Sequence, residues 1–234
     1  MRRTQPIWFA VAVGFAALVG VGSASAQTID THTGWNGTDY AFEFGAQNTA
    51  SYGQTFVAPG TSLNDFSFWL ANFEDGGSLE FSAYVGTWTG NAVGSIIWSS
   101  PGTYLGTGGS TFTQYLFNTG GVALTAGNTY VAFLNASPFI AANPDALNLE
   151  ELGADFSNPY AGGAYVFTNN GGDFSQVYNP WDQPGDNGFY GNGYDLAFVA
   201  DFNGAPVPEP GTMTLLATGL VGMAGFARRR RRRN

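Results

Sequence analysis

Hydrophobic and polar residues alternate along short segments of this chain, a pattern typical of β-strands with one buried face. In residues 79–85 every second position is hydrophobic, and Glu80 and Ser82 lie between them. Residues 66–70 show the same alternation with phenylalanine and leucine. The other segments that predict strands are 54–58, 95–99, 112–118, 129–135, 164–168 and 195–202.

Glycine-rich turns separate these segments, for example Pro59-Gly60 and Gly120-Gly121. Eight or more short strands with such connections predict an all-β protein, specifically an antiparallel β-sandwich of jelly-roll type. One helix is expected in a loop, with Asn143 as its N-cap and Pro144 at its first position, ending before Gly153.

The N-terminus has the features of a secretory signal peptide. Arg2 and Arg3 precede an apolar run over residues 7–21, and Ala24 and Ala26 supply the small residues that a signal peptidase accepts. Cleavage is therefore expected before Gln27. The alternative is an uncleaved N-terminal membrane anchor, which the small-residue site disfavours.

The C-terminus contains a second apolar run, residues 211–227, followed by six arginines. At 1.5 Å per residue this run extends roughly 26 Å as a helix, the short end of what a bilayer core requires. The arginines place its end on the cytoplasmic side, so the rest of the chain is expected outside the cytoplasmic membrane.

A short motif before this run makes the C-terminus more specific than a simple anchor. Val207, Pro208, Glu209 and Pro210 precede the apolar segment, and the arginine cluster follows it. This order resembles the PEP-CTERM sorting signal of Gram-negative bacteria. The resemblance implies recognition by a membrane-embedded exosortase, cleavage near the Pro-Glu-Pro sequence, and an association with exopolysaccharide and biofilm matrix. A plain tail anchor is the alternative.

The charge distribution separates the two ends from the body. We expect a signal peptide over residues 1–26, one β-sandwich domain over 27–205 and the sorting signal over 206–234. Sixteen of the 17 acidic residues lie in the body, whereas residues 4–227 contain no lysine or arginine. Phosphate binding needs cations, so nucleic acid is excluded as a partner. An anionic polysaccharide is disfavoured unless a divalent cation bridges it to the acids.

The body also resembles domains of other uncharacterised exported bacterial proteins. Residues 53–60, 66–70, 127–134 and 195–202 carry this resemblance, which implies a β-sandwich and assigns no activity. The chain has no cysteine, so no disulfide contributes to its stability.

Few residues are suited to catalysis. His32 is the only histidine and lies near the expected mature N-terminus, where chains usually fray, so it is interpreted as a surface residue without function. A glycoside hydrolase needs only two carboxylates, but no spacing singles out a pair. We therefore expect no enzymatic activity. The acids available in loops are Glu150, Glu151, Asp155, Asp182 and Asp186.

Two glycine-rich segments, 169–173 and 182–188, concentrate oxygen ligands of the kind that calcium prefers. Asp173, Asp182 and Asp186 are the candidate ligands. Ordinary turn chemistry is the favoured interpretation, because Asn, Asp and Gly dominate turns. No cofactor is expected otherwise.

Aromatic residues and hydrogen-bonding side chains gather in residues 178–194. Flat rings beside Asp and Asn suit the binding of a neutral sugar, although a loop packed by its own rings is the favoured alternative. Core packing accounts for Trp69, Trp88 and Trp98. The candidate glycan-binding residues are Tyr178, Trp181, Asp182, Asp186, Tyr190 and Tyr194.

Taken together, the sequence predicts an exported, non-enzymatic β-sandwich protein with a structural or adhesive role at the cell surface or in an extracellular matrix. Its expected partners are signal peptidase, the secretion machinery and an exosortase. A carbohydrate-binding module, with calcium as an aid to binding, is the alternative. A polysaccharide-acting enzyme is the third hypothesis.

Overall fold

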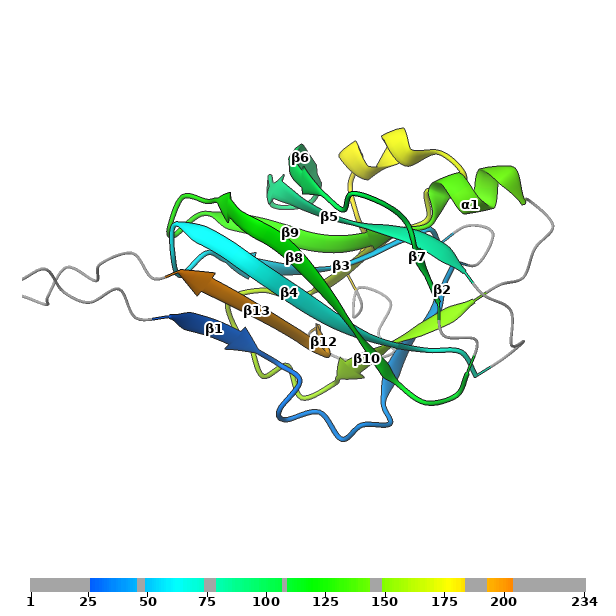
Figure 1. Cartoon of the computed structure of the whole chain (residues 1–234), viewed down its shortest axis with the longest axis horizontal. Coiled ribbons are helices and arrows are strands. Elements are labelled where there is room, and N and C mark those ends of the chain that lie inside the picture. The colour runs from blue at the N-terminus through cyan, green and yellow to red at the C-terminus, as the bar shows by residue number, and fades with distance from the viewer. Residues whose placement is uncertain are drawn as a thin grey trace, which may run out of the picture. The chain divides into compact units, whose positions relative to one another are not determined.

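The computed structural model describes residues 26–45, 49–73, 79–106, 109–143, 149–183 and 193–203. Within these residues two antiparallel sheets pack into a sandwich (Figure 1), which confirms the predicted all-β architecture. The expected signal peptide and C-terminal helix fall outside the described residues. Among the residues that are described, no helix combines the length and apolar character needed to cross a membrane.

The first sheet has seven described strands in the order β1-β13-β4-β10-β12, with β8 paired to β4 and β2 paired to β10. Figure 1 shows β8, β4, β13 and β1 side by side in this sheet. The strands are β1 (Gln27–Asp30), β2 (Tyr40–Phe44), β4 (Ser62–Ala71), β8 (Thr113–Ala123), β10 (Glu150–Asp155), β12 (Asp195–Leu196) and β13 (Phe198–Asn203).

The second sheet has six described strands in the order β11-β3-β9-β5-β6, with β7 paired to β5. The predicted strand at 129–135 is confirmed residue for residue, and the other predicted strands differ mainly at their ends. The strands are β3 (Ser51–Val57), β5 (Glu80–Trp88), β6 (Val93–Ser99), β7 (Tyr104–Leu105), β9 (Thr129–Asn135) and β11 (Tyr165–Thr168).

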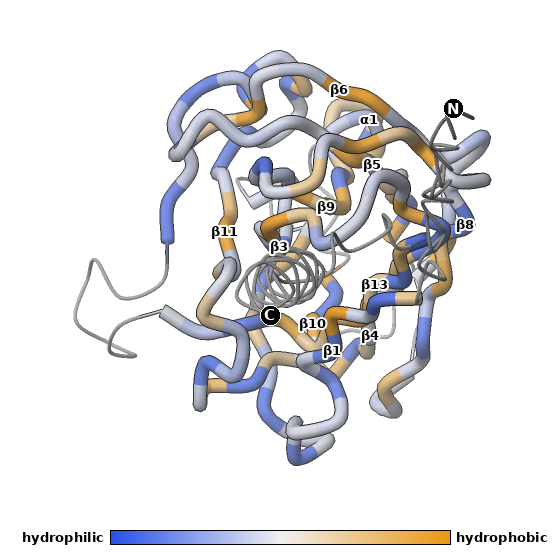
Figure 2. Tube along the Cα trace, turned by 90° about the vertical axis from the view of Figure 1, so that its left-hand side faces the viewer, coloured by the Kyte–Doolittle hydropathy of each residue, from blue (hydrophilic) through white to orange (hydrophobic). Residues whose placement is uncertain are grey.

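The main hydrophobic core lies between the two sheets and is rich in phenylalanine. The end-on view in Figure 2 shows hydrophobic segments on strands of both layers. The expected alternation in β5 is confirmed, because the hydrophobic positions of residues 79–85 are buried while Glu80 is exposed. Each fully buried ring contributes roughly 1.5–3 kcal/mol. Phe133 is fully buried in a second cluster, and the fully buried phenylalanines of the main core are Phe44, Phe56, Phe66, Phe68, Phe81, Phe117, Phe198 and Phe202.

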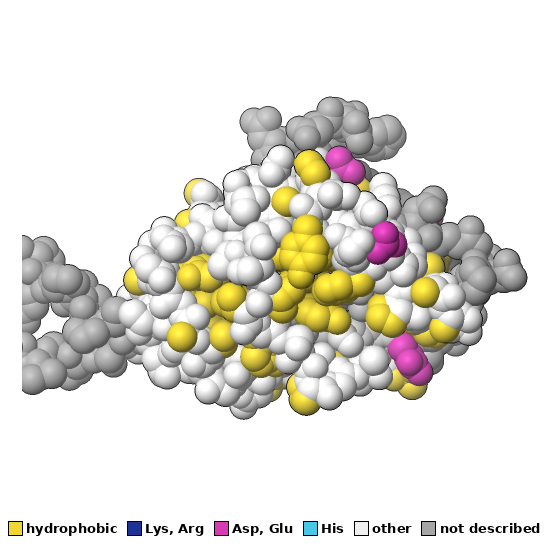
Figure 3. Space-filling view, turned by 90° about the horizontal axis from the view of Figure 1, so that it is seen from above, with side chains coloured by type: hydrophobic (Ala, Val, Ile, Leu, Met, Phe, Trp, Pro, Cys, Tyr) yellow, Lys and Arg dark blue, Asp and Glu magenta, His cyan; other side chains and the backbone are white. Residues whose placement is uncertain are grey.

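A second, smaller hydrophobic cluster lies on the outer face of the six-stranded sheet. Val131, Phe133 and Val166 project from this face, and the 3₁₀-helix η1 (Phe174–Tyr178) packs on it together with Trp181. Figure 3 shows this side of the molecule, with hydrophobic side chains gathered over β5 and β6. Part of the outer sheet face is thus covered by the chain itself.

The predicted loop helix is contradicted at both of its described ends, and Pro144 falls outside the described residues. The observed helix α1 (Ser137–Ala142) ends where the predicted one was to begin, and Asn143 is its C-cap, with Nδ2 donating to the carbonyl of Phe139 at 3.0 Å. Glu150 and Glu151 belong to β10 and are buried. Strand pairing of β10 with β2 and β4 overrides the local helical preference of these residues.

Candidate functional site

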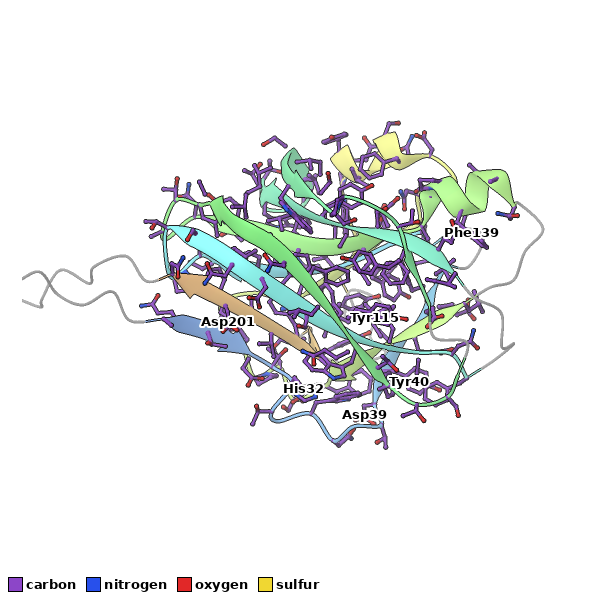
Figure 4. All side chains as sticks on the ribbon, viewed as in Figure 1. His32, Asp39, Tyr40, Tyr115, Phe139 and Asp201 are labelled. Carbon is purple, nitrogen blue, oxygen red and sulfur yellow. The ribbon has the colours of Figure 1, made fainter. Side chains whose placement is uncertain are left out.

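A pocket of about 630 Å³ lies where the chain enters β2, leaves β4 and approaches β8. Six of its ten lining residues carry aromatic rings, and the others include three hydroxyl side chains. Figure 4 labels His32 on the loop between β1 and β2 and Tyr40 at the start of β2, both toward the lower edge of the view. The lining residues are His32, Trp35, Gly37, Thr38, Tyr40, Trp69, Phe73, Ser110, Thr111 and Phe112.

The six rings contact one another in two groups that meet at Phe112. His32 stacks on Trp69, with ring centroids 3.8 Å apart and an interplanar angle of 14°. Trp35 meets Phe112 edge-on at 4.8 Å. Phe73 stacks on Tyr40 at 5.1 Å and meets Phe112 at 5.5 Å. Such pairs contribute roughly 0.5–1.5 kcal/mol each beyond the area they bury, so the rings hold one another in place.

The loop between β1 and β2 carries two of the rings and is fixed by its own hydrogen bonds. The Asp30 carboxylate accepts from the backbone N–H of Thr33 at 2.8 Å, and the Asn36 side chain accepts from the N–H groups of residues 38 and 39 at 2.9 Å. The indole N–H of Trp35 donates to the Asp39 carbonyl at 2.7 Å. These side-chain-capped turns set the loop before any ligand arrives.

The loop is also tied to the sheet through Thr31. Its backbone N–H donates to the carbonyl of Phe198 at 2.9 Å, and its hydroxyl accepts from the Phe198 N–H at 2.9 Å. The same hydroxyl donates to the carbonyl of Leu196. His32 therefore does not lie in a frayed terminus, and its expected position was wrong. The pairing of β1 with β13 anchors it, and it is half-buried against Trp69.

Trp69 also differs from its predicted role. It alternates with the buried Phe68 and Leu70, so it projects from the outer face of β4 toward the pocket and is only half-buried. Trp98 contacts Phe66 in the main core and Trp88 contacts Trp181 in the smaller cluster. Packing in the interior therefore accounts for two of the three tryptophans and not for Trp69.

Sequence reasoning missed the other rings of the pocket. Trp35 lies in the β1–β2 loop, Tyr40 begins β2, Phe73 follows the end of β4, and Phe112 directly precedes β8. An aromatic residue next to a strand end was the available signal. This signal points to a binding site only when the pairing of the strands shows that these strand ends lie close together.

The described glycan-binding candidates of the 178–194 segment do not share one exposed aromatic surface. Trp181 is buried, with its indole N–H donating to the Val177 carbonyl at 2.7 Å, and Tyr194 is buried against Phe156. Tyr178 is 47% exposed. Asp182 is exposed and bridges to Phe167 through its backbone. Asp186 and Tyr190 fall outside the described residues.

Two of the three candidate calcium ligands, Asp173 and Asp182, are described, and Asp173 is engaged by its neighbours. The Asp173 carboxylate caps η1 by accepting from the N–H and hydroxyl of Ser175 at 2.9 and 2.7 Å, which lowers its pKa. Within the described residues there is no group of three or more His, Cys, Asp or Glu side chains that could hold a metal ion. Asp173 is a helix cap, as the turn interpretation of this segment expects.

Two buried carboxylates face each other across β10 and β12. Asp155 pairs with Asp195, which accepts from the Gln54 amide at 2.6 Å and the Tyr160 N–H at 2.8 Å. Burial raises the pKa of Asp195 to about 6, and the charge of Asp155 adds to the rise, although both hydrogen bonds oppose it. Neither residue lines the aromatic pocket.

Comparison with known protein families identifies one segment. Residues 206–232 match the PEP-CTERM protein-sorting motif. This chain carries a PEP-CTERM signal. The matched segment includes Val207, Pro208, Glu209 and Pro210, so the chain is an exported protein sorted to the cell surface through an exosortase. No curated protein and no solved structure matches the chain.

Proposed function

We propose that the body of this PEP-CTERM protein is a non-catalytic carbohydrate-binding domain, through which the exported protein adheres to extracellular polysaccharide. The aromatic pocket is the observation that carries this proposal. A pyranose ring has an apolar C–H face and a rim of hydroxyl groups. The pocket offers both matching surfaces, with rings such as Phe73 and Trp69 beside the hydroxyls of Thr38, Ser110 and Thr111.

The exposure of the rings supports a binding role over simple packing. Phe73 is 41% exposed, and the other five rings are half-buried rather than enclosed. Leaving this much aromatic surface in contact with water is unfavourable unless a ligand covers it. The internally bonded β1–β2 loop reduces the entropy lost on binding, because its rings are already positioned.

The non-catalytic part of the proposal rests on the composition of the pocket. None of the described residues that line it is Asp or Glu, whereas hydrolysis of a glycosidic bond uses a pair of carboxylates on either side of that bond. The chemistry available in the pocket is therefore stacking and hydrogen bonding. A domain of this kind gives an exported protein a means of adhesion, which joins the structural and carbohydrate-binding hypotheses in one role.

Glycan-array binding followed by calorimetric titration of the full chain tests the proposal. Phe73→Ala and Trp69→Ala should each weaken binding at least about tenfold, since truncating a central aromatic contact commonly costs more than 1 kcal/mol. Phe73 is the safer variant because it is already partly exposed. Tyr178→Ala is the matched control, an exposed ring outside the pocket. Binding lost in Tyr178→Ala and retained in both pocket variants would assign the site to the 178–194 segment instead.

A further inference from the structure

The outer face of the seven-stranded sheet continues from the aromatic pocket. Trp69 pairs with Gln114 on β8, and both side chains project outward. Ser67 lies two residues before Trp69 in β4 and is flanked by Leu116 of β8 and Val199 of β13. Ser67 is itself only 2% exposed, so the exposed surface, which we call the platform, is formed across the three strands by Trp69, Gln114, Leu116 and Val199.

The platform is uncharged and presents both apolar and hydrogen-bonding groups. Leu116 is 56% exposed and Val199 is half-exposed. The Gln114 amide donates to the Ser67 hydroxyl at 3.0 Å, which leaves its carbonyl oxygen directed elsewhere. The platform therefore has the same mixed character as the pocket, and Trp69 belongs to both.

The surface is longer than one sugar bound in the pocket would cover. Asp65 lies four positions before Trp69 in β4, which corresponds to about 13 Å of strand. Asp65 pairs with Asp201 of β13, labelled in Figure 4, and the two carboxylates close the far end of the face with negative charge. Burial raises the pKa of Asp65, and the Asp201 charge adds to the effect.

This charge distribution determines the class of ligand that can lie there. No lysine or arginine occurs between residues 4 and 227, so an anionic polymer finds no counter-charge on the body. The acids at the end of the face would also repel an anionic polymer. An uncharged polymer meets neither penalty and matches the exposed row of Gln114, Leu116 and Val199.

We infer that the platform and the pocket together bind an internal segment of a linear, uncharged polysaccharide. One sugar stacks in the aromatic pocket, and the following sugars lie across β8, β4 and β13. This inference rests on the proposed function and deepens it, because it names the polymer class and predicts that affinity increases with chain length.

Calorimetric titration of the full chain with neutral gluco- and manno-oligosaccharides of two to six residues tests the inference. The wild-type affinity should rise with length, by about tenfold or more from disaccharide to hexasaccharide. A double variant, Gln114→Ala with Leu116→Ala, should remove most of this gain and leave disaccharide binding unchanged. Leu105→Ala is the matched control, since Leu105 is 58% exposed and lies on β7, away from the platform.

The outcomes separate the inference from the proposed function. Equal affinity for disaccharide and hexasaccharide, with binding still lost in Phe73→Ala, would overturn the platform and leave the pocket proposal intact. No binding to any oligosaccharide or to the glycan array would overturn both. Polygalacturonate that binds as tightly as the neutral hexasaccharides would overturn the assignment to an uncharged polymer.

Discussion

At the scale of single residues, the position of the pocket depends on small side chains placed beside large ones. A Cβ atom on Gly153 of β10 would lie 2.6 Å from the indole ring of Trp35, closer than such atoms approach in proteins. Glycine therefore allows the indole to lie close against the strand. The same strand hydrogen-bonds to the pocket loop, through the N–H of Ala154 and the carbonyl of Asp39 at 3.0 Å.

Gly153→Ala should consequently disturb ligand binding through the displacement of Trp35. We expect an affinity for oligosaccharide about tenfold lower and a loss of stability of roughly 1–3 kcal/mol, the usual cost of overpacking. Titration calorimetry and urea denaturation measure the two effects. Gly102→Ala is the control, because nothing lies within 4 Å of the added methyl group there. Unchanged affinity in a folded Gly153→Ala protein would show that Trp35 does not shape the site.

Asp195 gives a second prediction at this scale, concerning pH. Its folded-state pKa of about 6 exceeds the value of about 3.9 in an unfolded chain, so the folded protein binds the extra proton more tightly. This carboxyl therefore stabilises the fold most below about pH 4, and its contribution is lost as the pH rises to about 6. The shift of about two pKa units sets an upper limit of about 3 kcal/mol on the loss, since one unit corresponds to about 1.4 kcal/mol, and solvent screening lowers it to on the order of 2 kcal/mol.

Asp195→Asn should remove this dependence, whatever its effect on absolute stability. The measurement is the free energy of unfolding at intervals from pH 4 to 8 for wild type and variant. The difference between the two free energies should change mainly between about pH 4 and 6 and stay constant above about pH 7. Asp182→Asn, which removes an exposed acid, should follow the wild type. Parallel curves for wild type and Asp195→Asn would contradict the prediction.

At the scale of elements, the sequence predicted strands that are rich in β-branched and aromatic residues. Residues 80–85 of β5 alternate between buried and more exposed positions, whereas β9 was found although nearly all of its residues are buried. β10 could not be found in this way, because it begins with two glutamates and contains no β-branched or aromatic residue. Strand β1 has four residues, too short for periodicity, and is held by its pairing with β13. Tertiary pairing, not local preference, determines both strands.

The candidate site was beyond sequence reasoning for the same reason. Its rings come from the β1–β2 loop, the start of β2, the end of β4 and the approach to β8, which span residues 32 to 112. They come together only because β1, β13, β4 and β8 are neighbours in one sheet. Residues 178–194 looked more suitable because their rings are close in sequence. Trp181 and Tyr194 instead fill two different hydrophobic clusters.

At the scale of the whole molecule, all lysine and arginine residues lie in the two terminal segments. In Figure 3 the visible face of the described body accordingly shows scattered acids and no basic side chain. A surface of hydroxyl, amide and aromatic groups suits a hydrated, uncharged polymer. The PEP-CTERM motif over residues 206–232 directs this body to the cell surface, so sorting and the proposed binding use different parts of the chain.

This separation makes processing of the C-terminus directly measurable. Cleavage by an exosortase near Pro208, Glu209 and Pro210 would remove the arginine cluster and, with signal-peptide cleavage, every site for trypsin. In a host with an exosortase, the mature protein should lose the mass of this segment and resist trypsin even when denatured. In a host without the enzyme, denatured chain should be cut within residues 228–233.

Replacing Pro208, Glu209 and Pro210 together by alanine should give the unprocessed mass in both hosts, whereas the body variant Gly102→Ala should be processed like the wild type. Intact-mass spectrometry of the surface fraction, before and after trypsin, distinguishes these cases. Recovery of wild-type protein at the cell surface with all six arginines, in the host that has the exosortase, would contradict cleavage. The motif would then act as a membrane anchor, and adhesion through the aromatic pocket would operate on a protein that remains attached to the cell.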